Sequence, residues 1–352
     1  MSTAPRGTGA GLVRTVRGDI APATIGRVLF HEHLLFDLVL PGQRDAVDDP
    51  PVTLANRWQI DYRSNENRNN ARQRDPAVTA EELAALKMDG GSLVVDQSTY
   101  GLARDPGGLV RASAEADLHV VAAAGLYCAP YLEAGILDLS VEDLAARFIA
   151  EVEEGLDGTD IRAGLIGEIG CSWPIAPVER RALQAAVIAA KATGAAISVH
   201  PGRHVDAPFE IVAILSEAGA DLSRVVICHM DRTYPTGERI GELLATGVCV
   251  EWDFFGIEQS HYWFGEVELP TDLQRLRLIA DLMRAGFAER ILVSQDICTC
   301  TRMQRWGGHG YGHLLRNGPQ LMRRAGLDEA AIDQLLRRNP LRLLTLAPPA
   351  TT

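Results

Sequence analysis

The stretch Arg27-Val28-Leu29-Phe30-His31-Glu32-His33-Leu34 is a short run of β-forming residues that ends in two histidines separated by one residue. Side chains alternate between the two faces of a strand, so we expect His31 and His33 to point to the same side. Neutral imidazole is a common ligand of zinc and related ions. The stretch therefore predicts a strand that carries half of a metal site, although two unrelated core or surface histidines would give the same pattern.

Four later apolar runs place a possible metal ligand at the C-terminal end of a predicted strand. They end in Gly167-Glu168, Val199-His200, Cys228-His229 and Gln295-Asp296. Taken singly, each side chain has an ordinary interpretation as a buried polar group that is satisfied by the backbone. Six candidate ligands on five separate strand ends are better explained by one site at one end of a parallel barrel.

Apolar strands alternate with helices along the chain, which indicates a parallel sheet. Eight such units in 352 residues favour an α/β fold of the (β/α)8 TIM-barrel type over a doubly wound sheet. No GxGxxG sequence follows the first strand and no Walker A sequence occurs. We expect a disordered N-terminus over residues 1–12, a single (β/α)8 domain over residues 13–346 and a C-terminal tail over residues 347–352.

The remaining elements follow from hydrophobic periodicity and from capping residues. The strands after the first are predicted at residues 93–97, 120–125, 163–169, 196–200, 225–229, 248–251 and 291–296. The helices are predicted at residues 79–89, 105–117, 140–156, 177–193, 208–218, 237–246, 272–285, 313–325 and 328–338. A hairpin over residues 13–20 is expected to turn at Gly18-Asp19, and Thr79 is expected to cap the first helix.

Residues 41–78 show no convincing periodicity and are rich in Asp, Asn, Arg and Pro. A segment of this length inside a compact chain is usually functional or disordered. Because it follows a strand with two candidate ligands, it predicts either a lid or substrate wall, or a solvated excursion.

The charge and the cysteine content restrict the partners and the compartment. A net charge of -12 and a pI of about 5.3 argue against nucleic acid and anionic membranes as partners, and leave a small-molecule substrate. The six cysteines form no CxxC pair, and the N-terminus lacks the apolar segment of a secretory signal. We therefore expect a reduced, cytoplasmic protein.

Four histidines and two carboxylates suit two divalent ions, with zinc as the first choice and manganese or cobalt as alternatives. The candidate ligands are His31, His33, Glu168, His200, His229 and Asp296. A carboxylate on a middle strand can bridge two ions, and a water shared by the ions would lose a proton near neutral pH and attack a carbonyl or phosphoryl centre. Asp296 has a second possible role, as the group that takes this proton and delivers it to the leaving group.

Other residues are candidates for substrate binding. Arg203 follows a ligand strand directly and would suit a carboxylate, sulfonate or phosphate, although a structural salt bridge is an equal alternative. Tyr127 is placed to contact the leaving group or the polarised oxygen, with core packing as its alternative. Trp173, His309 and Tyr311 belong to loops on the same side and are expected to wall the pocket.

Several segments are similar to one known family. They are Gly164-Leu165-Ile166-Gly167-Glu168-Ile169-Gly170-Cys171-Ser172-Trp173-Pro174, His200-Pro201-Gly202-Arg203, Asp231-Arg232-Thr233 and Gly307-Gly308-His309-Gly310-Tyr311. Together with the His-x-His strand they resemble the phosphotriesterase family of the amidohydrolase superfamily, and within it the phosphotriesterase-related proteins of the phosphotriesterase-homology branch. The resemblance extends from about Val13 to Leu344.

This resemblance implies a distorted barrel with a binuclear metal centre, and a homodimer. His31, His33 and Asp296 would hold the more buried ion, and His200 and His229 the more exposed one. The phosphotriesterases proper bridge their ions with a carbamylated lysine on strand four. That strand has no lysine here, so the resemblance assigns the bridging role to Glu168.

Relatives in this family hydrolyse phosphotriesters, lactones and N-acyl amides. The resemblance implies, as the leading hypothesis, a metal-dependent hydrolase of a small N-acyl amide that carries an acidic group, such as N-acetyltaurine. The alternative is a lactonase acting on acyl-homoserine or sugar lactones, with weak phosphotriesterase side activity. A metal-free binding protein on the same barrel is the alternative that is not an enzyme.

Overall fold

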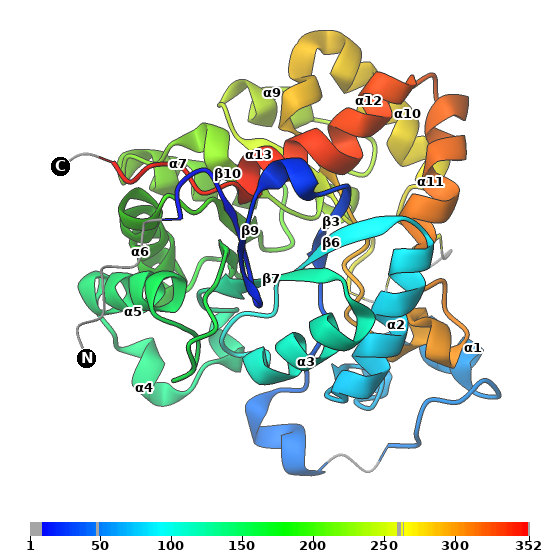
Figure 1. The fold of residues 1–352 in the computed structure, drawn as a ribbon, viewed down its shortest axis with the longest axis horizontal. Helices are drawn as coiled ribbons and strands as arrows, with labels where there is room; N and C mark the ends of the chain where they lie inside the picture. Colours follow the sequence, from blue (N-terminus) through cyan, green and yellow to red (C-terminus); the bar gives the residue numbers. More distant parts are fainter. Residues whose placement is uncertain (1–8, 47–48, 259–261, 263, 351–352) are drawn as a thin grey trace.

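Eight parallel strands form the centre of the computed structural model, which describes residues 9–46, 49–258, 262 and 264–350 (Figure 1). The strands are β3 (Arg27–Glu32), β6 (Gly91–Asp96), β7 (His119–Ala124), β8 (Leu165–Gly170), β9 (Ile197–His200), β10 (Val225–Ile227), β11 (Cys249–Trp252) and β12 (Ile291–Val293). Each strand pairs with the next in chain order, from β3 to β12. The prediction of a (β/α)8 barrel is confirmed.

The carboxylate of Glu32 joins the first strand of the barrel to the end of the last one. It accepts hydrogen bonds from the backbone N–H groups of Gln295 and Ile297, both at 3.0 Å, and from the hydroxyl of Ser294 at 2.9 Å. The backbone adds a bond from the N–H of Asp296 to the carbonyl of His31 at 3.1 Å. We call these contacts of Glu32 the Glu32 clasp. The clasp fixes Asp296 beside the strand that carries the two histidines.

Helices cover the outside of the strands (Figure 1). They are α2 (Pro76–Met88), α3 (Pro106–Ala116), α5 (Val141–Glu153), α6 (Pro177–Thr193), α7 (Ala207–Glu217), α9 (Ile240–Ala245), α10 (Asp272–Leu282), α11 (His313–Arg324), α12 (Glu329–Asp333) and α13 (Asn339–Leu344). Local sequence explains their ends: Ser140 and Asp143 form a capping box at the start of α5, and Gly194 (φ 75°) ends α6.

Two apolar layers stabilise the barrel. One lies between strands and helices, and the other lies inside the barrel, where residues from seven of the strands meet Ala196, which directly precedes β9. The inner layer contains Val28, Phe30, Leu93, Val95, Val121, Leu165, Ala196, Val226, Cys228, Cys249 and Leu292. Leu341, Leu343 and Leu344 of α13 pack against it. The interior of the barrel is therefore a filled core.

Three sequence expectations need correction. The hairpin β1 (Val13–Thr15) and β2 (Gly18–Ile20) pairs Thr15 with Gly18, so its turn lies at residues 16–17 and not at Gly18-Asp19. Helix α2 begins at Pro76 with Asp75 as its cap, because Pro fixes the φ that a first helical turn requires. Thr79, the expected cap, lies inside the helix and donates to the carbonyl of Leu34 at 3.0 Å. Helix α13 was not predicted.

The segment over residues 41–78 has more structure than its sequence predicts. It contains the helix α1 (Arg57–Tyr62) and the short strand β5 (Arg72–Gln73), which pairs with β4 (Phe36–Asp37) directly after the His-x-His strand. Arg72 and Arg74 both donate to the buried carboxylate of Asp37. These contacts hold the segment against the barrel. They support the prediction that residues 41–78 form a substrate wall over the prediction that they form a solvated excursion.

The ends of the chain were expected to be a disordered start and a short tail. Residues 1–8 and 351–352 lie outside the described residues. The described part of the start makes a contact, because the N–H of Gly11 donates to the carbonyl of Leu346 at 2.8 Å. Among the described helices, none combines the length and the apolar character that a bilayer span requires.

The Glu32 clasp gives a test of barrel closure. Glu32→Gln keeps the side-chain shape but replaces one carboxylate oxygen by an NH2 group. This group cannot accept a hydrogen bond, so at least one buried backbone N–H, of Gln295 or Ile297, loses its acceptor. We expect a loss of about 1–3 kcal/mol in the free energy of unfolding, measured by urea denaturation of the metal-free protein. Glu217→Gln, an exposed change at the end of α7, is the matched control. Equal stability of the two variants would contradict the closing role of Glu32.

Candidate metal centre

The structure brings all six predicted ligands together at the C-terminal ends of the strands. These are His31, His33, Glu168, His200, His229 and Asp296, each with no more than 8% of its surface exposed. Three overlapping sets of their ligand atoms lie within 4.8 Å of one another. The sets are His31, His33 and Glu168; Glu168, His200 and His229; and His31, His229 and Asp296.

Glu168 lies between the histidines of the first strand and those of the later strands. Its Oε1 is 3.4 Å from Nε2 of His33, and its Oε2 is 3.6 Å from Nε2 of His31. The same Oε2 is 3.0 Å from Nδ1 of His200 and 3.3 Å from Nε2 of His229. One carboxylate therefore reaches both halves of the cluster, which is the arrangement that a bridging ligand requires.

The backbone before Glu168 depends on a glycine. Gly167 has φ 112°, and a Cβ on it would lie 1.9 Å from the carbonyl oxygen of Ser198 on β9. Only glycine allows β8 and β9 to approach this closely. The pairing of β8 with β9 shifts register between Ile166 and Ile169, so the strand is irregular where it presents Glu168.

His229 and Asp296 lie beyond the ends of their strands. The sequence had predicted both residues as the last residues of those strands. Strands β10 and β12 end at Ile227 and Val293. His229 has φ 61° and Asp296 has φ 46°, a left-handed conformation that is uncommon for residues other than glycine. Such outliers occur preferentially at functional sites, where the surrounding structure holds them in place. Asp296 Oδ1 lies 3.1 Å from Nε2 of His33.

The residues fit divalent cations. Nε2 of His31 is buried and has no hydrogen-bond partner among the described residues. Burial lowers the pKa of His200 to about 3 and also lowers the pKa of His229, so both imidazoles are neutral and have lone pairs for a metal. Burial alone would raise the pKa of Glu168, but His200 and His31 outweigh it, and the carboxylate stays charged.

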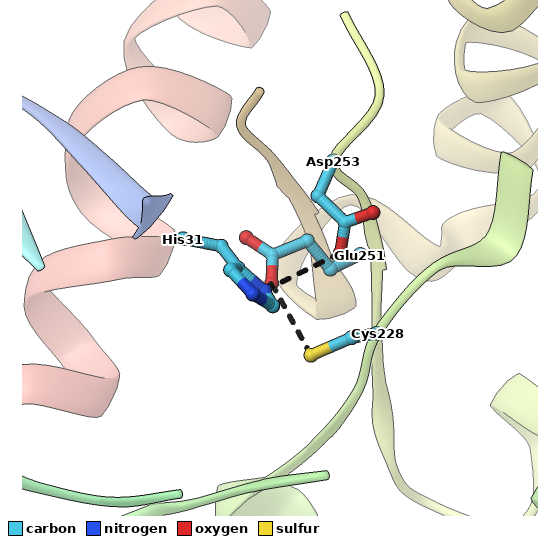
Figure 2. Close-up of side chains that lie close together, drawn as sticks. All are labelled: His31, Cys228, Glu251 and Asp253. Atoms are coloured by element: carbon cyan, nitrogen blue, oxygen red, sulfur yellow. Dashed lines mark hydrogen bonds and ion pairs between the residues drawn. The ribbon is translucent and has the colours of Figure 1, made fainter. Parts of the chain in front are cut away.

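A second layer of acidic residues lies behind the histidines (Figure 2). Nδ1 of His31 is 3.2 Å from Glu251 Oε2 and 3.4 Å from Asp253 Oδ2, and Nδ1 of His229 is 2.9 Å from Asp253 Oδ1. The thiol of Cys228 donates to Glu251 at 3.6 Å. Carboxylates in this position accept the Nδ1–H, and they leave Nε2 free to bind a metal.

Sequence reasoning missed Glu251 and Asp253. It predicted the strand at residues 248–251 but gave it no functional residue. The available signal was their spacing, because two acids separated by one residue at the end of a buried strand point to the same side. They alternate with the buried Trp252, which packs in the outer layer.

Above the cluster lies a cavity of about 630 Å³. Of the expected substrate-binding residues, Tyr127, Trp173 and Arg203 line it. The Tyr127 ring meets the His200 ring edge-on with centroids 5.3 Å apart, and Trp173 stacks on His204 at 4.3 Å. The segment after β4 also contributes to the lining, with Gln43, Asp61, Ser64, Asn67, Arg68 and Ala71.

The structure places His309 and Tyr311 elsewhere. Neither is among the described residues that line the cavity. Tyr311 is fully buried, and its hydroxyl donates to the backbone carbonyl of His33 at 2.6 Å, so it supports a ligand from behind. The His309 ring lies 4.9 Å from the His313 ring, beside Gly256. Loop glycines therefore did not indicate which way these side chains point.

Arg232 is a second cavity residue that the sequence reasoning missed. It was noted only as part of the similar segment Asp231-Arg232-Thr233, without a role. It lies in the short helix α8 (Met230–Thr233), three residues after His229, and lines the cavity with 5% of its surface exposed. An arginine so soon after a ligand at a strand end was the signal that pointed to it.

The fold is a (β/α)8 barrel whose strand ends carry a buried cluster of histidines and carboxylates that could hold metal ions. The model of the phosphotriesterase family matches residues 11–344, and the chain belongs to this family. The resemblance inferred from its motifs is confirmed.

Relatives and solved structures agree with this assignment. The chain is 38% identical to the human N-acetyltaurine hydrolase over 343 residues, covering 96% of this chain and 98% of the relative. A resiniferatoxin-binding protein from Rhodobacter sphaeroides has a similar structure, with a TM-score of 0.89 and 32% identity over 97% of this chain and 98% of that one. The phosphotriesterase homology protein from Escherichia coli, solved with phosphate in its active site, has a TM-score of 0.76 and 28% identity, covering 91% and 99%.

The acidic layer behind the histidines gives a test of metal affinity. Glu251→Gln removes the charge that accepts the Nδ1–H of His31, so we expect zinc to bind about 10-fold more weakly or worse, measured by competition with a chelating dye. Glu242→Gln, an exposed change on α9, is the control and should bind zinc as the wild type does. Unchanged affinity in Glu251→Gln would show that the layer does not support the ligands.

Proposed function

We propose that the cluster holds two divalent metal ions, with zinc as the first choice and manganese or cobalt as alternatives. His31, His33 and Asp296 would hold one ion and His200 and His229 the other, with Glu168 between them. The overlapping ligand sets support this division, because Glu168 belongs to both the His31–His33 set and the His200–His229 set.

We infer that the protein is a hydrolase. Two ions in this position would activate a water molecule and polarise the carbonyl of a substrate. The hydrogen bond to His33 and the nearby histidines outweigh burial and hold the pKa of Asp296 well below its usual range, so its carboxylate can accept a proton. Asp296 borders the cavity and would deliver this proton to the leaving nitrogen. Burial holds the pKa of Tyr127 well above its usual value, so its hydroxyl remains a donor.

The proposed substrate is a small N-acyl amide that carries an acidic group. The observation that carries this proposal is the 38% identity to a human N-acetyltaurine hydrolase over nearly the whole chain. The cavity is compatible with it, because two arginines, Arg203 and Arg232, line the cavity. A homodimer and a cytoplasmic location stay predictions from the sequence.

Initial rates on matched substrates test this function. The zinc- or manganese-loaded protein should cleave N-acetyltaurine with a far higher kcat/KM than γ-lactones, δ-lactones or a phosphotriester. Asp296→Asn keeps the shape of the side chain but removes the proton acceptor, and should lower kcat by a factor of about 100 or more. Glu242→Gln, remote from the cavity, should retain full activity.

Each outcome of this experiment has a clear meaning. Efficient cleavage of lactones without cleavage of the amide would contradict the proposed substrate and favour the lactonase alternative. Near-normal turnover by Asp296→Asn would remove this residue from proton transfer. No turnover of any substrate by the metal-loaded protein would favour the binding-protein alternative.

A further inference from the structure

Arg232 is held at the inner end of the cavity by the backbone, beside a histidine of the cluster. Its Nη2 donates to the carbonyl of Pro201 at 2.7 Å and lies 3.3 Å from Nε2 of His200. Its Nη1 is buried and has no hydrogen-bond partner among the described residues. The guanidinium is therefore fixed by one nitrogen, while the other keeps N–H groups that have no acceptor among the described residues, in a side chain that lines the cavity.

The charge of Arg232 is not compensated within the described part of the chain. No described carboxylate lies within 4.0 Å of its guanidinium. Of the other buried arginines, Arg14 pairs with Asp19 and Arg275 with Asp231 and Asp272, while Arg302 donates to three backbone carbonyls. Asp231, the sequence neighbour of Arg232, is thus already engaged by another cation. Buried arginines are normally paired, because an isolated buried charge costs several kcal/mol.

Arg203 lies further out and in a different setting. It is exposed, its guanidinium lies 4.9 Å from the centroid of the Phe264 ring, and its Nε is 3.5 Å from the hydroxyl of Tyr262. Like Arg232, it has no carboxylate partner among the residues that the structure describes. The cavity therefore has an inner, rigid cation and an outer cation that is accessible to solvent.

We propose that Arg232 is the inner anion-binding residue of the site and that it binds the acidic group of the substrate, while Arg203 contacts the same group from the outer side. This inference rests on the proposed function and deepens it. It moves the principal role in acid recognition from Arg203, which the sequence suggested, to a residue with a buried, unpartnered N–H group. Arginine suits a sulfonate or a carboxylate, because its N–H groups match the oxygens of such anions.

The position of Arg232 also restricts the length of the substrate. Its Nη2 lies 3.3 Å from a histidine of the metal cluster, so the acidic group binds close to the point where the carbonyl is cleaved. A substrate with a short spacer between amide and acid satisfies both contacts. A long spacer would take the acid past Arg232 towards Arg203 and the mouth of the cavity.

Binding of a small sulfonate tests the inference without any turnover. Propane-1-sulfonate is titrated into the zinc-loaded protein by calorimetry, with propan-1-ol as the neutral probe. Arg232→Gln loses a charged hydrogen bond, so its affinity for the sulfonate should be about 10- to 100-fold lower than that of the wild type. Arg232→Lys retains the charge and should recover part of the affinity. Arg239→Gln, an arginine outside the cavity, should bind as the wild type does.

Kinetics separate the role of Arg232 from a general structural role. Arg232→Gln should lower kcat/KM for N-acetyltaurine by the same factor, but should change kcat/KM for the neutral N-acetylethanolamine by no more than about threefold. With the wild type, kcat/KM should fall as the spacer of an N-acetylaminoalkanesulfonate is lengthened. Equal losses on both amides, sulfonate binding that does not change in Arg232→Gln, or a flat spacer series would each overturn the inference.

The two proposals fail in different ways. If the sulfonate binds in a manner that depends on Arg232 but no amide is cleaved, the anion site stands and the proposed reaction is wrong. If N-acetyltaurine is cleaved and Arg232→Gln cleaves it as fast as the wild type, the reaction stands and the anion site is wrong. The spacer series uses only the wild type, so it decides the matter even if Arg232→Gln does not fold.

Discussion

The buried carboxylate of Glu32, which stands between His31 and His33 in the sequence, closes the barrel. The rest of the structure depends on this closure. The candidate ligands come from strands far apart in the sequence, and they form one cluster only if the last strand returns to the first. Glu32 accepts hydrogen bonds from residues 294, 295 and 297, and so fixes Asp296 next to His33. The residue that separates the two histidines in sequence thus has a structural role as specific as theirs.

Next to this closure, the site has two layers of side chains, and the outer layer orients the histidines of the inner one. Glu168 lies between two groups of histidines, and Glu251 and Asp253 accept from the far sides of His31 and His229. Burial raises the pKa of Glu251 to about 7, against the opposing effect of the hydrogen bond with His31, so this carboxyl group gains and loses its proton near neutral pH. The left-handed conformations of His229 and Asp296 are held by the same surroundings.

The sequence was sufficient to predict the barrel and the six clustered residues, because the strand period and the strand ends are local signals that need no knowledge of packing. It was insufficient where long-range contacts decide. Thr79 looks like a helix cap but is drawn inside by the carbonyl of Leu34, and Tyr311 looks like a pocket residue but points to His33. Arg232 and Glu251 were missed although their positions near strand ends gave a local signal, because the partners that show their roles are brought together only by the fold.

Anomalous X-ray diffraction at the zinc edge, from crystals of the zinc-loaded protein, tests most directly whether Glu168 bridges two ions held by this cluster. We expect two anomalous peaks on either side of the Glu168 carboxylate, one beside His31 and His33 and the other beside His200 and His229. A single peak, or two peaks with Glu168 bound to neither, would contradict it.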